Sequence, residues 1–492
     1  MERDALGYFT IVLHAHLPFI REPKHDRFLE ENWFHEALSE CYLPLLMSFE
    51  SLIRDGVDFR VTISLTPTLI SMFDDELLRT RFERRLNELI ELSEKETERL
   101  RSEPSLYEVA RFYRDRFVAQ KEFYLQRCGC DVTGAFRRLQ DAGYVEILTC
   151  AATHGFLPLL RHEPSAVRAQ IRTAVDHYID RFGRQPEGIW LPECGFYPGL
   201  DEELAAAGIR YFFVESHAVL HGTNRPEHGV YAPTVCPSGV AAFARDPECA
   251  QQVWSVEEGF PGAPDYREFY RDIGHDLPLE YVHKYIGPDG LRVETGLKYH
   301  RVPGATDKKE PYVRERAMQQ AAQHASLFLD WRCRQMEWLA PQMDRHPIIV
   351  APYDAELFGH WWFEGPEWIN HLLRQIAFGQ RTLITATPSE YLAERDESQG
   401  STPVASSWGA GGYNQVWINR KNDWIAPELL RVSHRLERLA HSRLNATGVE
   451  RRLLNQAARE ALLAQASDWA FMIKNDTNSQ FCLLYTSPSP RD

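Results

Sequence analysis

GIWLPE (188–193) and PIIVAPYD (347–354) are the two stretches of sequence on which the predicted fold of this chain rests. Each is an apolar run bounded by Gly or Pro, and each ends in an acid, Glu193 or Asp354. Continuous apolar runs of this length are typical of strands that are buried on both faces of a parallel sheet. We therefore expect both carboxylates where the strands leave the core, the edge that carries the functional residues of barrel enzymes.

A third strand is predicted at YFTIVLHAHLP (8–18), an apolar run that closes on His14 and His16. Successive side chains of a strand point to opposite faces, so residues two apart share a face. The two imidazoles should therefore lie side by side where this strand ends. Three strand ends together offer a glutamate, an aspartate and two histidines.

Alternating strand and helix patterns indicate an α/β fold. Helical patterns lie between several of the strand-like runs, for example at 166–182 and 201–208. Such alternation predicts a parallel sheet whose strands are joined by crossover helices. The further strand-like runs are RVTISLTPTLI (60–70), YVEILTCAATHGF (144–156), YFFVES (211–216), VAAFARD (240–246) and QQVWS (251–255).

The chain of 492 residues is longer than one ordinary core, and its composition changes along its length. Residues 1–394 contain these runs and form the predicted catalytic barrel domain. Within them, about 72–140 is charged and helix-favouring, which predicts a helical insertion. The stretch 256–310 is rich in Gly, Pro and Tyr and predicts a long loop over the open face of the barrel.

A polar hinge at 395–407 introduces a predicted α-helical C-terminal domain, 395–480. Long helices are expected there at 427–444 and 449–471. The final stretch, 481–492, continues no helical period and resembles translated read-through of a sequencing adapter. We therefore treat it as a non-native tail.

The composition argues against nucleic acid and membranes as partners. The chain has 55 basic and 70 acidic residues, a net charge of −15, and no long block of Lys or Arg. Its nine cysteines lack C-x-x-C spacing, which favours reduced cytosolic thiols over a zinc ribbon or a disulfide framework. Without a signal-peptide pattern or a window of about 18 apolar residues, the expected location is cytoplasmic.

Glu193 and Asp354 form a candidate pair of catalytic carboxylates. Asp354 is followed by aromatic and apolar residues in YDAELFGHWW (353–362), where loss of water would raise its pKa toward that of a general acid. Paired carboxylates of this kind act on glycosidic bonds. The structural alternatives are a salt-bridged Glu193 at a strand end and a solvated Asp354 on a loop.

The histidines admit a second interpretation, a metal centre. A His-x-His pair at the end of a first barrel strand is also typical of metal-dependent amidohydrolases, and His217 with Asp354 would extend the ligand set formed by His14 and His16. The surroundings are rich in aromatic rings rather than ligands. We therefore expect no metal.

Three tryptophans, Trp254, Trp408 and Trp417, lie next to polar segments. They are either core residues or flat platforms on which the C–H face of a sugar stacks. Trp408 stands in a Gly-rich turn that offers little else to cover it, which favours the platform.

Taken in order, several motifs resemble those of glycoside hydrolase family 57, in particular its 1,4-α-glucan branching enzymes. The resemblance runs from residue 7 to about 475. It implies an incomplete (β/α)7 TIM-like barrel, a helical insertion after the second strand, a helical C-terminal domain over the cleft, and no cofactor. The motifs are HAHLP (14–18), WLPECGF (190–196), APYDAELFGHWW (351–362), SWGAGG (407–412), VWIN (416–419) and SDWAF (467–471).

The resemblance also implies residue roles. Glu193 would be the nucleophile and Asp354 the acid/base of a retaining enzyme that cleaves α-1,4 bonds of an α-glucan and transfers the chain to form α-1,6 bonds. The protein would be a monomer or weak oligomer. The implied substrate-binding residues are His14, His16, Trp33, His154, Arg245, Trp254, His360, Trp408, Trp417 and Asp468.

One departure from the family pattern keeps a hydrolytic alternative open. The loop after the strand-like run YFFVES consists here of residues 217–233 alone. Branching members often have a longer loop at this place, with a tyrosine at its tip. Because a lid keeps water away from an intermediate, a short loop favours an α-amylase acting through the same residues. A glucan-binding protein without activity is a further alternative.

Overall fold

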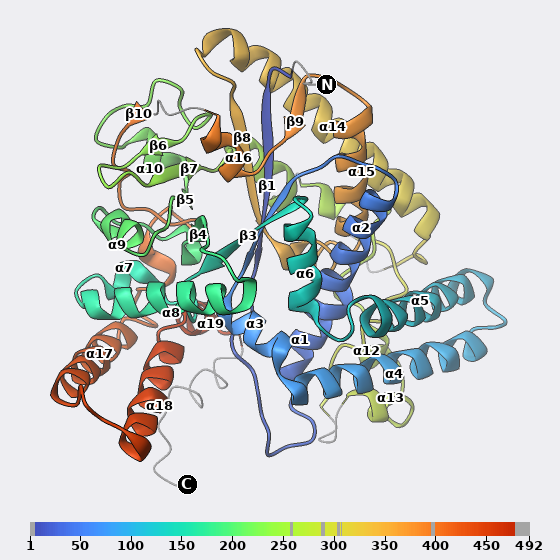
Figure 1. Ribbon diagram of the computed structural model, residues 1–492. Helices are drawn as coiled ribbons and strands as arrows, with labels where there is room; N and C mark the ends of the chain where they lie inside the picture. Colours follow the sequence, from blue (N-terminus) through green and yellow to red (C-terminus); the bar gives the residue numbers. More distant parts are fainter. Residues whose placement is uncertain are drawn as a thin grey trace.

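A computed structural model of the chain describes residues 5–255, 259–286, 291–302, 306, 308–394 and 399–477. The predicted tail at 481–492 lies outside the described residues. The central element of the protein is a curled parallel sheet with strand order β7-β5-β4-β3-β2-β1-β8 (Figure 1). These strands are β1 (Gly7–Ala15), β2 (Val61–Leu65), β3 (Val145–Cys150), β4 (Gly188–Trp190), β5 (Tyr211–Val214), β7 (Ala241–Ala244) and β8 (Ile348–Asp354).

The sheet forms an incomplete (β/α)7 barrel, which confirms the predicted fold class. Alternate side chains of the strands, among them Val12, Leu148 and Phe213, fill its interior in one apolar cluster. β7 and β8 stand at the two ends of the strand order, and a backbone hydrogen bond of 2.9 Å from Asp246 N to Val350 O connects them. Short strands extend the edges: β6 (Thr234–Val235) beside β7, β10 (Gln399–Gly400) beside β6, and β9 (Leu383–Thr385) beside β1.

Helices surround this sheet (Figure 1). On the N-terminal half they are α1 (Glu31–Glu36), α2 (Leu43–Arg54), α3 (Pro67–Asp74), α4 (Glu76–Arg99), α5 (Pro104–Glu122), α6 (Val132–Asp141), α7 (Leu157–Leu160), α8 (Pro164–Phe182), α9 (Leu200–Ala206) and α10 (Ser216–Leu220). They continue as α11 (Pro247–Trp254), α12 (Ile273–Asp276), α13 (Leu279–Ile286), α14 (Arg314–Leu339), α15 (Gly365–Phe378), α16 (Pro388–Ala393), α17 (Ile425–Ser442), α18 (Gly448–Ala464) and α19 (Ser467–Asn475).

The stretch predicted as a helical insertion is helical. α4 and α5 lie side by side and project from the barrel in Figure 1. α4 begins at Glu76, directly after its N-cap Asp75. The Asp75 carboxylate accepts the Leu78 N–H at 3.1 Å, which supplies one of the hydrogen bonds that the first turn lacks.

The prediction of a strand at 251–255 is wrong, because residues 251–254 belong to α11 and Ser255 is its C-cap. The Asp246 carboxylate accepts the Cys249 N–H at 2.7 Å, and Pro247 occupies the first helical turn, where its missing N–H costs nothing. A cap followed by proline outweighs the apolar pattern that suggested a strand.

The predicted loop over 256–310 is more structured than expected. Its described part contains α12 and α13 and packs against α4. The buried Arg85 of α4 donates hydrogen bonds to the carbonyls of Tyr285 at 2.6 Å and Thr295 at 3.3 Å. Residues 256–258, 287–290, 303–305 and 307 lie outside the described part.

The helix expected at 449–471 breaks at Gln465 and Ala466. Ala466 is extended and forms a bridge with Gly155, and the Ser467 N–H donates to the carbonyl of His154 at 2.9 Å. A new helix, α19, starts there and carries Ser467 toward the ends of the barrel strands. The break therefore places the start of α19 beside the strand ends.

The hinge predicted at 395–407 is attached to the barrel over its described part. Ser401 N donates to Val235 O at 3.0 Å, Val404 N to Ala218 O at 2.9 Å, and Ser406 pairs with Phe196. The chain therefore runs along the barrel before it enters α17.

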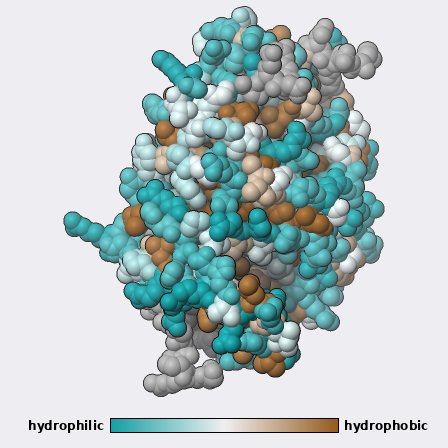
Figure 2. All heavy atoms as spheres, turned by 60° about the vertical axis from the view of Figure 1, so that its left-hand side comes forward, coloured by the Kyte–Doolittle hydropathy of each residue, from teal (hydrophilic) through white to brown (hydrophobic). Residues whose placement is uncertain are grey.

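The face of the molecule in Figure 2 is largely hydrophilic, with apolar residues in small separate areas. Among the described residues, no helix combines the length and the apolar character that a membrane span requires.

Asp246→Ala should destabilise the protein strongly. Asp246 and Arg332 are each 1% exposed and pair at 3.1 Å, and the same carboxylate caps α11. Removing Asp246 leaves the buried Arg332 guanidinium with only the exposed carboxylate of Glu248, at 2.9 Å, and it also removes the cap of α11, at a cost of about 3 kcal/mol. Thermal unfolding should show a clearly lower midpoint. Asp330→Ala, which breaks an exposed pair with Arg334 on α14, is the control and should change little. Equal midpoints for the two variants would contradict this role.

Candidate active site

The strand ends that carry Glu193, Asp354 and His14 meet at one edge of the barrel. His14 is in register with Asp354 on one side and with Ser64 of β2 on the other. Glu193 follows β4, on the opposite side of the curled sheet from β8. The side chains of Glu193 and Asp354 remain partly exposed among buried neighbours, so a substrate can reach both.

The backbone at Glu193 is unusual. Glu193 has φ 61° and ψ 23°, and Cys194 after it has φ 51°, a left-handed conformation that side chains other than glycine rarely adopt. His154 has φ 57°. Such strain persists only where surrounding contacts impose it and clusters at functional sites. Here the left-handed backbone turns the Glu193 side chain out of the strand end and toward Trp408 and Ser467 of the C-terminal segment.

Two groups from the C-terminal segment donate hydrogen bonds to the Glu193 carboxylate. The indole N–H of Trp408 donates to Oε2 at 2.7 Å, and the hydroxyl of Ser467 donates to Oε1 at 2.7 Å. The Trp408 backbone N–H also donates to the Glu193 carbonyl at 2.9 Å. Each carboxylate oxygen therefore has a donor from outside the barrel.

The Ser467 contact is the last link of a hydrogen-bond chain whose direction follows from chemistry. An ionised Glu193 can only accept, so Ser467 donates to it and its oxygen accepts Nδ1–H of His154 at 2.8 Å. A neutral His154 with its proton on Nδ1 presents a bare Nε2. That atom accepts Nε2–H of His14 at 2.9 Å, and His14 Nδ1 accepts from Ser64 at 3.3 Å. Every donor in the chain points toward Glu193.

Both histidines of this chain are neutral. Burial, followed by the neighbouring imidazoles, lowers the pKa of His14 well below its ordinary value, and burial with His16 does the same to His154. The rings are also held by stacking, with 4.8 Å between the centroids of His14 and Trp190 and 3.8 Å between those of His16 and His154. Packing therefore fixes the positions of the rings, and the hydrogen bonds fix their tautomers.

His16 belongs to a second set of contacts at the same edge. Its Nε2 lies 3.1 Å from the carboxylate of Asp468, its Nδ1 lies 3.1 Å from the hydroxyl of Thr66, and its backbone N–H donates to Glu356 at 3.1 Å. Burial opposes ionisation of Asp468, but the His16 imidazole holds the pKa of Asp468 below its ordinary value. α19 thus contacts the barrel edge through both Ser467 and Asp468.

The environments of the two candidate catalytic carboxyls differ. Burial raises the pKa of Asp354 well above its ordinary value, and the carboxylates of Glu356 and Glu193 raise it further. Burial also raises the pKa of Glu193, but the hydrogen bonds from Trp408 and Ser467 oppose that shift. Asp354 is therefore suited to hold a proton, and Glu193 to remain charged.

Arg245 lies at the same edge, after β7. Its guanidinium forms an ion pair of 3.1 Å with Glu215, which follows β5, and its charge opposes the rise in the pKa of Asp354. The sequence-predicted residues His14, His16, His154, Arg245, Trp408 and Asp468 therefore gather around the two carboxyls.

Other predicted binding residues lie in different surroundings. Trp417 is 2% exposed, and its ring stacks on Phe156 at 4.4 Å, which covers that face. Trp254 is 40% exposed at the end of α11, and Trp33 is partly buried on α1. The Nδ1–H of His360 donates to the Glu40 carboxylate at 2.7 Å. Roles for these four in substrate binding stay predictions.

Sequence reasoning did not single out Ser467, Glu356 or Trp190. Ser467 directly precedes Asp468 in the SDWAF motif, so it was within reach of the pattern. Glu356 follows Asp354 by two residues and accepts hydrogen bonds from Tyr42 and the His16 backbone, which ties the ends of β1 and β8 together. Nothing in the sequence around Glu356 or Trp190 distinguishes these residues from others near a strand end.

The ligand set of the amidohydrolase alternative is not assembled. Within the described ranges, the groups that could hold a metal include His14 with Cys150 and His154, and His16 with His154 and Asp468. Neither joins Asp354 to the His14 and His16 pair. His217 instead bonds the Gly412 carbonyl at 2.9 Å.

Comparison with known proteins places this site in a family. The model of glycosyl hydrolase family 57 matches residues 10–332, and that of the 1,4-alpha-glucan branching enzyme C-terminal region matches residues 428–484. A 1,4-alpha-glucan branching enzyme of Thermococcus kodakarensis is 34% identical over 95% of this chain and 70% of its own length. A probable 1,4-alpha-glucan branching enzyme of Mycobacterium tuberculosis is 29% identical over 96% and 89%.

Two crystal structures are similar to this chain over nearly its whole length. The alpha-amylase AmyC of Thermotoga maritima has a TM-score of 0.91 and 43% identity, covering 98% of this chain and 90% of its own. The branching enzyme of Pyrococcus horikoshii has a TM-score of 0.87 and 35% identity, covering 98% and 88%. The extent of these matches, together with the family model over most of the barrel, shows that the chain belongs to glycosyl hydrolase family 57.

Proposed function

We propose that this protein is a retaining α-glucan enzyme, a 1,4-α-glucan branching enzyme that cleaves an α-1,4 bond and transfers the donor chain to a 6-hydroxyl. The observation that carries the proposal is the pair of carboxyls with different environments: Glu193 accepts two hydrogen bonds, and burial raises the pKa of Asp354 well above its ordinary value. Relatives named as branching enzymes over nearly the whole chain support it.

In the first step, Asp354 donates its proton to the oxygen of the scissile bond while Glu193 attacks the anomeric carbon. The bond to the leaving chain breaks, and the donor chain becomes a glycosyl ester of Glu193. The raised pKa of Asp354 supplies the proton near neutral pH. Trp408 and Ser467 hold the two oxygens of Glu193 in place for attack.

In the second step, the Asp354 carboxylate takes a proton from the 6-hydroxyl of an acceptor glucan. The acceptor oxygen bonds to the anomeric carbon, and the ester bond to Glu193 breaks, which restores both carboxyls. When water is the acceptor, the same sequence gives hydrolysis. Branching and hydrolysis therefore differ only in the acceptor.

An α-amylase is the second candidate, and a specific observation favours it. The structure with 43% identity is an alpha-amylase, and the segment after β5 is short, with α10 and a connection up to β6 at Thr234. A short segment leaves the ester of Glu193 less shielded from water. Both candidates use the same proposed catalytic residues.

Incubation with amylose separates the candidates. A branching enzyme should give new α-1,6 bonds, seen by chain-length analysis after debranching, with few new reducing ends. Because of the short segment after β5, we expect a larger share of reducing ends than long-loop branching enzymes give. Products without α-1,6 bonds would show an α-amylase, and unchanged amylose would contradict both.

Glu193→Gln should abolish turnover while preserving the fold. The amide keeps the shape of the side chain but cannot form the glycosyl ester, so kcat should fall by several orders of magnitude. The control is Glu202→Gln on the exposed face of α9, which should retain full activity. Activity of Glu193→Gln within tenfold of the wild type would refute its role as the nucleophile.

Ser467→Ala should move the acid limb of the pH–rate profile to higher pH. Losing a donor to a charged group costs about 1.5–3 kcal/mol, which raises the pKa of Glu193 by roughly one to two units. Glu193 must be ionised to attack, so activity would be lost earlier as the pH falls. Ser467→Thr keeps the hydroxyl, so the acid limb of its pH–rate profile should lie where it does in the wild type. An unmoved acid limb in Ser467→Ala would show that this hydrogen bond does not act on Glu193.

A further inference from the structure

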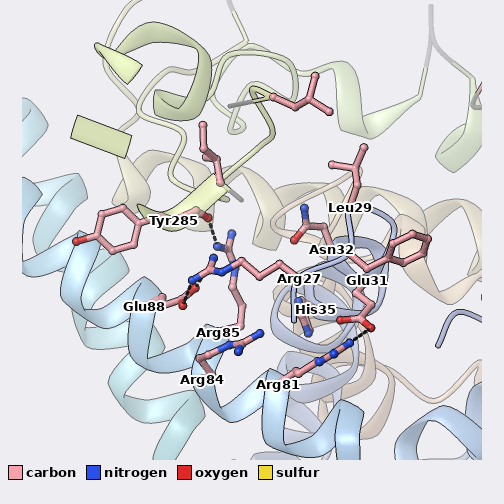
Figure 3. Close-up of a pocket in the computed structure, with 13 residues that line it drawn as sticks. Arg27, Leu29, Glu31, Asn32, His35, Arg81, Arg84, Arg85, Glu88 and Tyr285 are labelled. Carbon is pink, nitrogen blue, oxygen red and sulfur yellow. Dashed lines mark hydrogen bonds and ion pairs between the residues drawn. The ribbon is translucent and has the colours of Figure 1, made fainter. Parts of the chain in front are cut away.

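A cavity of about 60 Å³ lies apart from the paired carboxyls, on the segment that follows β1 (Figure 3). Its walls come from residues 27–35, from α4, and from the end of α13 with Leu291. By volume it can hold several water molecules or a small ligand group. The segment begins at His16, directly after β1 ends, and leads from the barrel edge of the proposed active site to the cavity.

The cavity has an excess of positive charge. Four arginines line it, Arg27, Arg81, Arg84 and Arg85, against two glutamates. Arg27 pairs with Glu88 at 2.5 Å, and Arg81 pairs with Glu31 (Figure 3). The lining therefore has two more positive than negative charges.

The two remaining arginines differ in their surroundings. Arg85 is 7% exposed and donates to main-chain carbonyls, and no ion pair is found for it among the described residues. Arg84 pairs with Asp26, whose side chain is 81% exposed at the rim. Within the described residues, neither Arg84 nor Arg85 thus forms an ion pair with a buried carboxylate.

His35 is an unpartnered polar group in the same wall. Its side chain is 9% exposed, and neither ring nitrogen has a hydrogen-bond partner among the described residues. One face of the ring stacks on Phe82. Burial, followed by the charges of the four arginines, lowers the pKa of His35 to about 3. A neutral His35 has one N–H to donate, and buried donors in native proteins are nearly always satisfied.

We propose that this cavity binds a phosphate group, either free phosphate or the phosphate of a sugar phosphate. A phosphate monoester carries close to two negative charges at neutral pH, which matches the two excess positive charges of the residues that line the cavity. Guanidinium groups bind phosphate oxygens through paired N–H donors, and each arginine here has donors beyond those it uses. The His35 N–H would supply a further bond. This site is separate from the proposed function and does not depend on it.

Calorimetric titration of the full chain with inorganic phosphate, glucose 6-phosphate and glucose, at constant ionic strength, tests the proposal. Both phosphates should bind saturably and raise the unfolding temperature, and glucose should not compete with them. Equal affinity for the two phosphates would identify free phosphate as the ligand. Tighter binding of glucose 6-phosphate would identify a sugar phosphate.

Two variants locate the binding. Arg84→Gln alters a partly exposed guanidinium and should fold, and His35→Phe keeps the stacked ring but removes its N–H. Each should weaken phosphate binding at least tenfold. Arg111→Gln, on the exposed face of α5, is the charge-matched control and should bind normally.

Three results would overturn the proposal. The first is the absence of saturable phosphate binding. The second is phosphate binding that both variants retain, which would place the ion elsewhere. The third is glucose binding that displaces phosphate and is lost in Arg84→Gln, which would make the cavity a subsite for neutral sugar.

Discussion

The hydrogen bonds that Glu193 accepts from Trp408 and Ser467 are the constraint on which the site depends. A carboxylate at a strand end among buried neighbours is stable in its charged form only when its oxygens are satisfied. Both donors belong to the segment after the barrel, so that segment must dock before Glu193 is paired. The barrel and the C-terminal helices therefore form the site jointly.

This dependence explains several local features. The left-handed backbone of Glu193 directs its carboxylate out of the strand end, and the break before α19 brings Ser467 to it. His14 and His154, buried and neutral, extend the chain of donors back into the barrel. Each feature is costly or unusual alone, and together they fix one orientation of Glu193 and favour its charged form.

The barrel and the carboxyl pair could be predicted from sequence because their signals are local. Apolar runs ending in Glu193 and Asp354, with turn residues around them, define strands whatever their neighbours are. The helix α11 (Pro247–Trp254) could not be recognised from its apolar residues, because a cap at Asp246 and the following proline determine it. Pairing of Ser467 with Glu193 could not be predicted, because it joins residues 274 positions apart through tertiary contacts alone.

Trapping of the covalent intermediate tests the central claim most directly. The protein would be incubated with a fluorinated maltosyl fluoride, which forms the glycosyl ester quickly and releases it slowly, and then digested and analysed by mass spectrometry. The account predicts one maltosyl adduct, on the peptide that contains Glu193, at the Glu193 side chain. An adduct on Asp354 or on any other residue, or the absence of an adduct from protein that turns over glucan, would contradict it.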